Sequence, residues 1–186
     1  MEWRLNLAVL VTLSIVWAHL TAAEPVSPLD PADPGTAELA RMEDAFARDG
    51  GDVVLARRLA ETYLELGRPG LAIATLRAGE PGILEHPVVA HRLAQAYEAS
   101  GRVLDARATA ELALMRCARS LGTGDAPSGT PIPRFACDPH QHAVLSMHRD
   151  ALEHMVEWGV AVPASDARAQ RAYDLAMRRV RIAARH

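Results

Sequence analysis

A repeat with a period of 34 residues constrains this chain more than any other feature of its 186-residue sequence. Residues 54–75 (VLARRLAETYLELGRPGLAIAT) align with residues 88–109 (VVAHRLAQAYEASGRVLDARAT) at 11 identities in 22 positions. Chance would give far fewer identities, so we interpret the two segments as copies of one structural unit. The fold is therefore expected to be built from a repeated packing unit.

Each copy has the residue spacing of a helix followed by a stop. In the first copy Ala56, Leu59, Ala60 and Tyr63 fall on one stripe of a helix. Gly67 then stands where the helix must end and turn. The chain is rich in Ala and Leu and only 4% aromatic. This composition favours closely packed helices over a β-sandwich.

A second helix is expected after each glycine, antiparallel to the first. Two antiparallel helices approach closely only where their side chains are small. We therefore expect Ala60 to face Ala72 across the first hairpin, and the equivalent residues Ala94 and Ala106 to face each other across the second. The tyrosine of each copy would then fill the space between one hairpin and the next.

The repeat resembles the tetratricopeptide repeat, whose period is 34 residues and whose signature pairs Leu-Gly/Ala, Tyr and a later Ala at this spacing. The resemblance covers residues 53–118, as two units at 53–86 and 87–118. The usual Trp at the fourth position is replaced by Ala56 or Ala90. The resemblance implies an all-α fold, namely a right-handed α-solenoid of helical hairpins, and a role in protein interaction.

Two units are fewer than the three usually needed to stabilise such a stack, so flanking segments are expected to cover its ends. Leu39, Met42 and Phe46 have helical spacing and are followed by Gly50-Gly51. This pattern predicts an N-terminal capping helix from residue 37. The cap and the two units together form a predicted domain at residues 37–118.

A degenerate third hairpin is predicted for residues 139–186. Its first helix would run to Trp158 and stop at Gly159, and its second would start near Ser165, a good N-cap residue. The residues expected to be buried are Val144, Leu145, Leu152, Met155 and Val156 in the first helix, and Ala169, Ala172, Tyr173, Ala176 and Val180 in the second.

The first 23 residues have the pattern of a secretory signal peptide. Arg4 supplies a basic start, Leu7 to Trp17 form a short apolar stretch, and Thr21-Ala22-Ala23 places small residues at the cleavage positions. A bilayer span needs ~20 apolar residues, so an uncleaved membrane anchor is the less favoured alternative. We expect an exported protein of a bacterial envelope, periplasmic or secreted. Prolines at every third position of residues 24–36 predict an extended linker.

Two cysteines flank a predicted loop at residues 119–138, which is rich in Gly, Pro, Ser and Thr. Cys117 stands before this loop and Cys137 near its end. Two cysteines in an exported chain most simply pair. A disulfide that closes a loop of this size contributes roughly 3 kcal/mol by chain-entropy estimates. It would hold the C-terminal hairpin to the repeats.

The segment around Cys137 also carries the densest group of metal-ligand residue types. Cys137, His140 and His142, with Cys117, could bind zinc or copper through thiolate and imidazole groups. Their spacing matches no established zinc signature, and a disulfide would consume both thiols. A metal- or thiol-active envelope protein is therefore an alternative function, and we expect no cofactor. His148 lies on the apolar stripe of its helix and is expected in the core.

Charge patterning gives limited information about partners. A formal net charge of −3 argues against nucleic-acid binding. Several arginines recur at helical spacing near the C-terminus, where they could contact an anionic surface or form an ordinary solvated helix face. These arginines are Arg168, Arg171, Arg178, Arg179, Arg181 and Arg185.

Motifs for catalysis are missing from the sequence. It contains no G-x-S-x-G, no Gly-rich phosphate loop, no H-E-x-x-H and no C-x-x-C. We therefore expect no enzymatic activity. The chain is instead expected to present a binding surface or to act as a structural spacer in a larger assembly.

The resemblance implies that the first helix of each repeat lines a concave face. Residues outside the Ala/Leu/Tyr stripe would face outward there and bind a peptide or helix of an envelope partner. The predicted partner-binding residues are Val54, Arg57, Glu61, Leu64, Val88, His91, Gln95 and Glu98.

Overall fold

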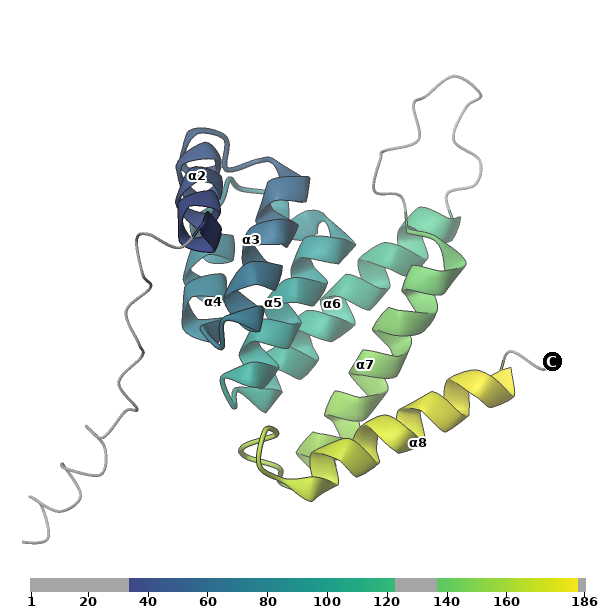
Figure 1. Cartoon of the computed structure of the whole chain (residues 1–186). Helices are drawn as coiled ribbons and strands as arrows, with labels where there is room; N and C mark the ends of the chain where they lie inside the picture. Colours follow the sequence, from purple (N-terminus) through teal and green to yellow (C-terminus); the bar gives the residue numbers. More distant parts are fainter. Residues whose placement is uncertain (1–33, 123–136, 184–186) are drawn as a thin grey trace, which may run out of the picture. The chain divides into compact units, whose positions relative to one another are not determined.

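The computed structural model describes residues 34–122 and 137–183 (Figure 1). Contacts divide the chain into two units, residues 1–38 and residues 39–186, and every helix described below lies in the second unit except the start of α2. The predicted signal peptide lies outside the described residues. Most of the predicted linker and of the 119–138 loop also lies outside them.

All secondary structure in the described ranges is helical, which confirms the all-α prediction. None of the helices there has both the length and the apolar character needed to cross a membrane. The elements are α2 (Pro34–Arg48), α3 (Val53–Glu65), α4 (Pro69–Ala78), a short 3-10 helix η1 (Ile83–Glu85), α5 (Pro87–Ala99), α6 (Val103–Gly122), α7 (Pro139–Glu157) and α8 (Ala167–Ala183).

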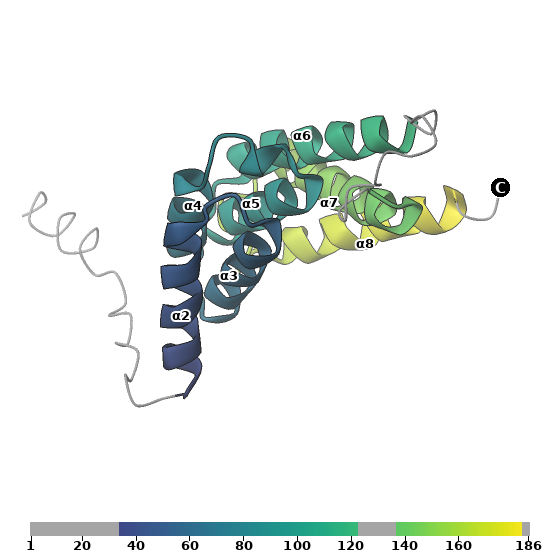
Figure 2. The same ribbon diagram turned by 90° about the horizontal axis from the view of Figure 1, so that it is seen from above.

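The two repeat copies fold as two helical hairpins, α3–α4 and α5–α6. Helix α3 begins at Val53, where the Asp52 side chain accepts hydrogen bonds from the N–H groups of Val54 (2.9 Å) and Leu55 (3.0 Å). Helix α5 begins 34 residues later at Pro87, in the first turn, where the missing N–H of proline costs nothing. Helix α5 packs against α3, α4 and α6 (Figures 1 and 2).

Three helices end in the same glycine turn. Gly67, Gly101 and Gly159 have φ values of 65°, 75° and 64°, a left-handed conformation that favours glycine. The residue after each glycine closes the turn by donating to a carbonyl five residues earlier, from Arg68 to Tyr63, from Arg102 to Tyr97 and from Val160 to Met155, over 2.8, 2.8 and 2.9 Å. Helix α7 therefore ends as α3 and α5 do, although it lacks the repeat signature.

Buried alanines lie in both repeat hairpins. Ala60 and Ala72 are 0% exposed, and so are Ala94 and Ala106. Their burial agrees with the predicted alanine pairs, because small side chains let two helices approach closely. The third hairpin uses the same residue type, since α8 buries Ala169, Ala172 and Ala176.

Each repeat tyrosine reaches the helix that precedes its own hairpin. The Tyr63 hydroxyl donates to Glu43 of α2, and Arg77 of α4 donates to the Tyr97 hydroxyl over 3.4 Å. Glu43 and Arg77 are themselves 34 positions apart. Helix α2 buries its predicted apolar residues. It contacts the tyrosine of the first hairpin in the same way that α4 contacts the tyrosine of the second.

The third hairpin continues the same order of packing, with α6 against α7 and α7 against α8. The Sγ atoms of Cys117 and Cys137 lie within bonding distance, and their Cα atoms are 5.1 Å apart, a separation typical of disulfides. Both cysteines are buried in a cluster with Ala90, Ala113 and Leu145. This cluster holds the start of α7 against α6.

Two helix starts differ from the prediction. Helix α2 begins at Pro34, inside the predicted extended linker, because proline is tolerated in the first turn of a helix. Helix α8 is capped by Asp166 and not by Ser165. The Arg168 N–H donates to Oδ1 of Asp166 over 2.9 Å, whereas the Ser165 hydroxyl donates to the Val162 carbonyl over 3.5 Å.

The third hairpin buries most of the residues predicted for its core. His148 is 2% exposed, as expected for a core position. Of the other predicted residues, Leu145, Leu152, Met155, Ala169, Ala172 and Ala176 are buried, and Val144, Val156, Tyr173 and Val180 are half-buried.

Candidate binding pocket

The predicted partner-binding residues lie on α3 and α5 and differ in accessibility. Val54 of α3 is 44% exposed. The others are half-buried, namely Arg57, Glu61 and Leu64 on α3, and Val88, His91, Gln95 and Glu98 on α5.

Arg92 joins two of these residues, Glu61 and Gln95, across the two helices. Its guanidinium donates to Glu61 of α3 and, over 2.7 Å, to Oε1 of Gln95. Arg57 lies 3.5 Å from the same Glu61 carboxylate. Glu61 is therefore neutralised by two guanidinium groups. Arg92 is not among the predicted binding residues. Its identity with Arg58 indicates only an equivalent position in the repeat.

A pocket of about 570 Å³ lies beside Gln95, between α5 and the start of α8. Gln95, Glu98 and Ala99 form its α5 wall. The opposite wall consists of residues 163–167, in the α7–α8 connection, and the first two turns of α8. Several lining residues are exposed, so the pocket opens to solvent. Two of the eight predicted residues, Gln95 and Glu98, thus line a cavity.

The pocket owes its second wall to the length of the α7–α8 connection. In the repeat hairpins the next helix begins two residues after the turn glycine, at Pro69 after Gly67 and likewise in α6. Helix α8 begins eight residues after Gly159. The six additional residues carry the chain away from the tight turn before the second helix starts. They form the outer wall of the pocket.

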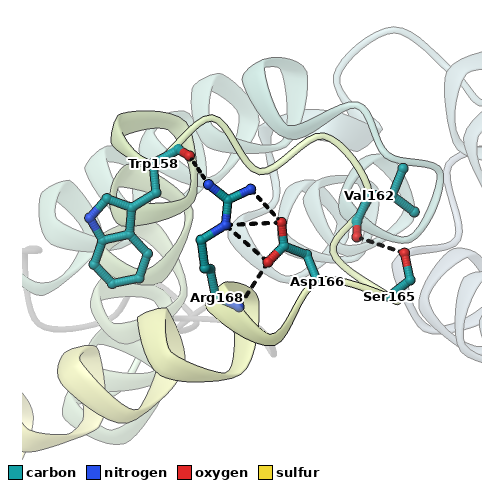
Figure 3. Close-up of polar contacts among 5 residues, drawn as sticks. All are labelled: Trp158, Val162, Ser165, Asp166 and Arg168. Atoms are coloured by element: carbon teal, nitrogen blue, oxygen red, sulfur yellow. Dashed lines mark hydrogen bonds and ion pairs between the residues drawn. The ribbon is translucent and has the colours of Figure 1, made fainter.

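Arg168 fixes this connection in place (Figure 3). Its guanidinium donates to both oxygens of Asp166, with Nε at 3.0 and 3.1 Å, and to the Trp158 carbonyl over 2.5 Å. The Arg168 guanidinium holds the pKa of the Asp166 carboxyl below its ordinary value. Arg168, which is itself exposed, thus joins the end of α7 to the start of α8.

Glu98 is the acceptor at the centre of a polar cluster behind the pocket. The Tyr173 hydroxyl lies 2.9 and 2.8 Å from its two oxygens, and Nε2 of His148 lies 2.9 Å from Oε2. The side chains of Glu98 and His148 are 14% and 3% exposed. Burial, with the Glu98 carboxylate second, raises the pKa of Tyr173. The hydroxyl is therefore a neutral donor.

Two histidines pack behind this carboxylate. The rings of His91 and His148 meet edge to face with centroids 5.0 Å apart, and the His148 ring stacks on Tyr173 at 6.2 Å. Burial, and then the neighbouring His148 and Arg92, lower the pKa of His91 to about 3. Nε2 of His91 and Nδ1 of His148 are buried, and neither has a hydrogen-bond partner within residues 34–122 and 137–183. His91, one of the predicted partner-binding residues, is thus half-buried with its ring against His148.

The pocket surface offers acceptors rather than basic groups. Its lining carboxylates are Glu98 and Asp166, and no Arg, Lys or His lines it within the described part of the chain. Asp166 is already paired with Arg168, whereas Glu98 receives its hydrogen bonds, as far as the described residues go, from a hydroxyl and an imidazole. The remaining wall combines alanines and a proline with the polar side chains of Gln95, Ser165 and Gln170.

The alternative metal ligands are not brought together. Cys137 lies against Cys117, and His140 is exposed at the start of α7 while His142 is half-buried. Residues 34–122 and 137–183 contain no group of three His, Cys, Asp or Glu side chains able to hold a metal ion.

The described C-terminal arginines are exposed on α8. Arg179 lies 3.9 Å from Asp150, and Arg171 and Arg178 are exposed. The side chain of Arg181 and the whole of Arg185 lie outside the described residues.

Comparison with known proteins identifies no relative: no protein-family model, no curated protein and no solved structure matches this chain.

Proposed function

We propose that this chain is an exported interaction module of tetratricopeptide type, whose hairpins form a right-handed α-solenoid and whose α3–α5 face binds a segment of a partner protein. The observation that carries the proposal is the pocket of about 570 Å³ that adjoins this face at Gln95 and Glu98. Ligand pockets have volumes of roughly 300–1,000 Å³. The cavity is therefore large enough to hold a side chain of a bound segment.

Two features that recur every 34 residues, and the order in which the helices pack, support the repeat architecture. The turn glycines Gly67 and Gly101 have the same backbone conformation, and Tyr63 and Tyr97 make equivalent contacts with the preceding helix. From α3 to α8, helices adjacent in the sequence also pack against one another. This order of packing is the one expected of a repeat protein, in which each unit contacts its neighbours.

The polar groups on α3 and α5 support recognition of a peptide. Arg92, Glu61 and Gln95 form a hydrogen-bonded row between the two helices. Such a row positions donors and acceptors before a ligand arrives, which lowers the entropic cost of binding. An extended segment or a helix could lie along this row and place one side chain in the pocket.

The test is phage display: a library of random peptides is selected for binding to the purified, unreduced chain. We expect enriched peptides that bind with micromolar affinity. The variant Ala164→Trp would fill the pocket from its rim and weaken binding by about tenfold. Ala118→Trp places the same side chain at an exposed position of α6 outside the pocket and should leave affinity unchanged.

The experiment has two outcomes that would overturn the proposal. One is the absence of any enriched peptide after repeated rounds. The other is a set of peptides whose affinity falls equally for Ala164→Trp and Ala118→Trp, since binding would then not involve the pocket.

A further inference from the structure

Glu98 accepts hydrogen bonds from a hydroxyl and an imidazole but from no guanidinium within the described residues. The Tyr173 hydroxyl is a neutral donor. The second donor is Nε2 of the His148 imidazole, which lies 2.9 Å from Oε2 of Glu98. Within the described residues no guanidinium bonds to the Glu98 carboxylate, whereas the Arg168 guanidinium bonds to both oxygens of Asp166. Glu98 is therefore the lining carboxylate with which an incoming guanidinium or ammonium group can pair.

The cluster also fixes the orientation of this carboxylate. Tyr173 comes from α8 and His148 from α7, so Glu98 is held by two helices besides its own. The ring of His148 is confined in turn between His91 and Tyr173. A carboxylate held in this way is prepared for a ligand and loses little side-chain entropy on binding.

The rest of the pocket suits a long side chain with a cationic end. Ala99, Ala164, Ala169 and Pro163 give the wall an apolar surface along which methylene groups can lie. The second lining carboxylate, Asp166, is occupied by Arg168 and cannot compete with Glu98 for a cation. No basic side chain lines the cavity in the described residues, so an incoming cation meets no repulsion at the wall.

The geometry points to a basic side chain, arginine or lysine, of the partner segment as the group that occupies this pocket, with Glu98 accepting its charge-assisted hydrogen bond. This inference rests on the proposed function and adds the chemistry of the bound residue. Glu98 is one of the eight predicted partner-binding residues, and the sequence does not distinguish it from the others. The structure distinguishes it, because among the described residues Glu98 is the lining carboxylate that no guanidinium contacts.

The peptides selected by phage display test this inference. We expect them to share one arginine or lysine, and replacing that residue by citrulline or norleucine should weaken binding at least about tenfold. Glu98→Gln should cause the same loss. Glu157→Gln, at a 58% exposed carboxylate near the end of α7 and outside the pocket, should bind as the unmodified chain does.

A second measurement uses only the unmodified chain, so its result does not depend on whether a variant folds. N-acetyl-arginine amide should displace a labelled selected peptide from the unmodified chain, whereas the neutral, nearly isosteric N-acetyl-citrulline amide should not. Equal displacement by both compounds would overturn the inference. Selected peptides without a shared basic residue would overturn it too while leaving the proposed function intact, and a failure to select any peptide would overturn both.

Discussion

The repeat hairpins and the third hairpin begin alike and then diverge. Helices α3, α5 and α7 all end at a glycine with positive φ and the same closing hydrogen bond. The chain enters the next helix two residues later in the repeats and eight residues later before α8. A short connection leaves room only for closely packed alanines, whereas the long one adds a wall to a pocket. The pocket therefore lies where the chain departs from its own repeat.

The first prediction asks whether the two regions are equally well packed. Leu59 in α3 and Leu152 in α7 are both 0% exposed. Replacing either by alanine should lower the free energy of unfolding by about 3 kcal/mol, since each change removes buried surface and leaves a cavity. Urea unfolding followed by circular dichroism measures both. A loss below about 1 kcal/mol for Leu152→Ala alone would mean that the third hairpin is loosely attached.

The second prediction separates the tight hairpin from the long connection. Ala94 is 0% exposed between helices, and Ala164 is exposed in the α7–α8 connection. Ala94→Leu should cost about 2 to 3 kcal/mol because the added carbons force the helices apart. Ala164→Leu should change stability by no more than about 0.5 kcal/mol. Similar melting temperatures for Ala94→Leu and the unmodified chain would contradict the close approach.

The repeat region could be predicted from sequence because its determinants are local. The helical stripe, the turn glycine and the alanine positions each follow from residue types a few positions apart. The cluster around Glu98 has no such signature, because His148 is 50 residues away along the chain and Tyr173 is 75 residues away.

The α7–α8 connection could not be predicted for a related reason. Ser165 and Asp166 are both good N-cap residues, and the choice depends on Arg168, which binds Asp166 and the Trp158 carbonyl together. The extra length of the connection was visible in the sequence. The position of its residues opposite α5 was not.

The third prediction concerns the joint between the two regions, where His91 and His148 pack together. The pKa of His91 is lowered to about 3, so the unfolded chain binds a proton below about pH 6.5 that the folded chain does not. Stability should therefore fall as pH drops from 6.5 towards 3, by about 2 kcal/mol between pH 7 and pH 5. Urea unfolding of His91→Leu should lack this part of the dependence.

A matched variant distinguishes this effect from general acid unfolding. His140→Gln removes an exposed histidine at the start of α7 and should keep the full pH dependence. If the free energies of unfolding of His91→Leu and His140→Gln fall in parallel on acidification, the packing of His91 against His148 is not the cause of the acid sensitivity.

The prediction with the smallest expected effect compares alanine substitutions at the three turn glycines. Alanine at Gly67 or Gly159 should cost about 1 kcal/mol, because φ is positive and no atom lies within 4 Å of the added Cβ. At Gly101 the Cβ would come within 3.1 Å of the Ala161 carbonyl oxygen, which belongs to the α7–α8 connection. Gly101→Ala should therefore cost about 1 kcal/mol more than the other two. Equal losses at all three positions in urea unfolding would show that the connection does not press on the second repeat, and the wall opposite α5 would lose that support.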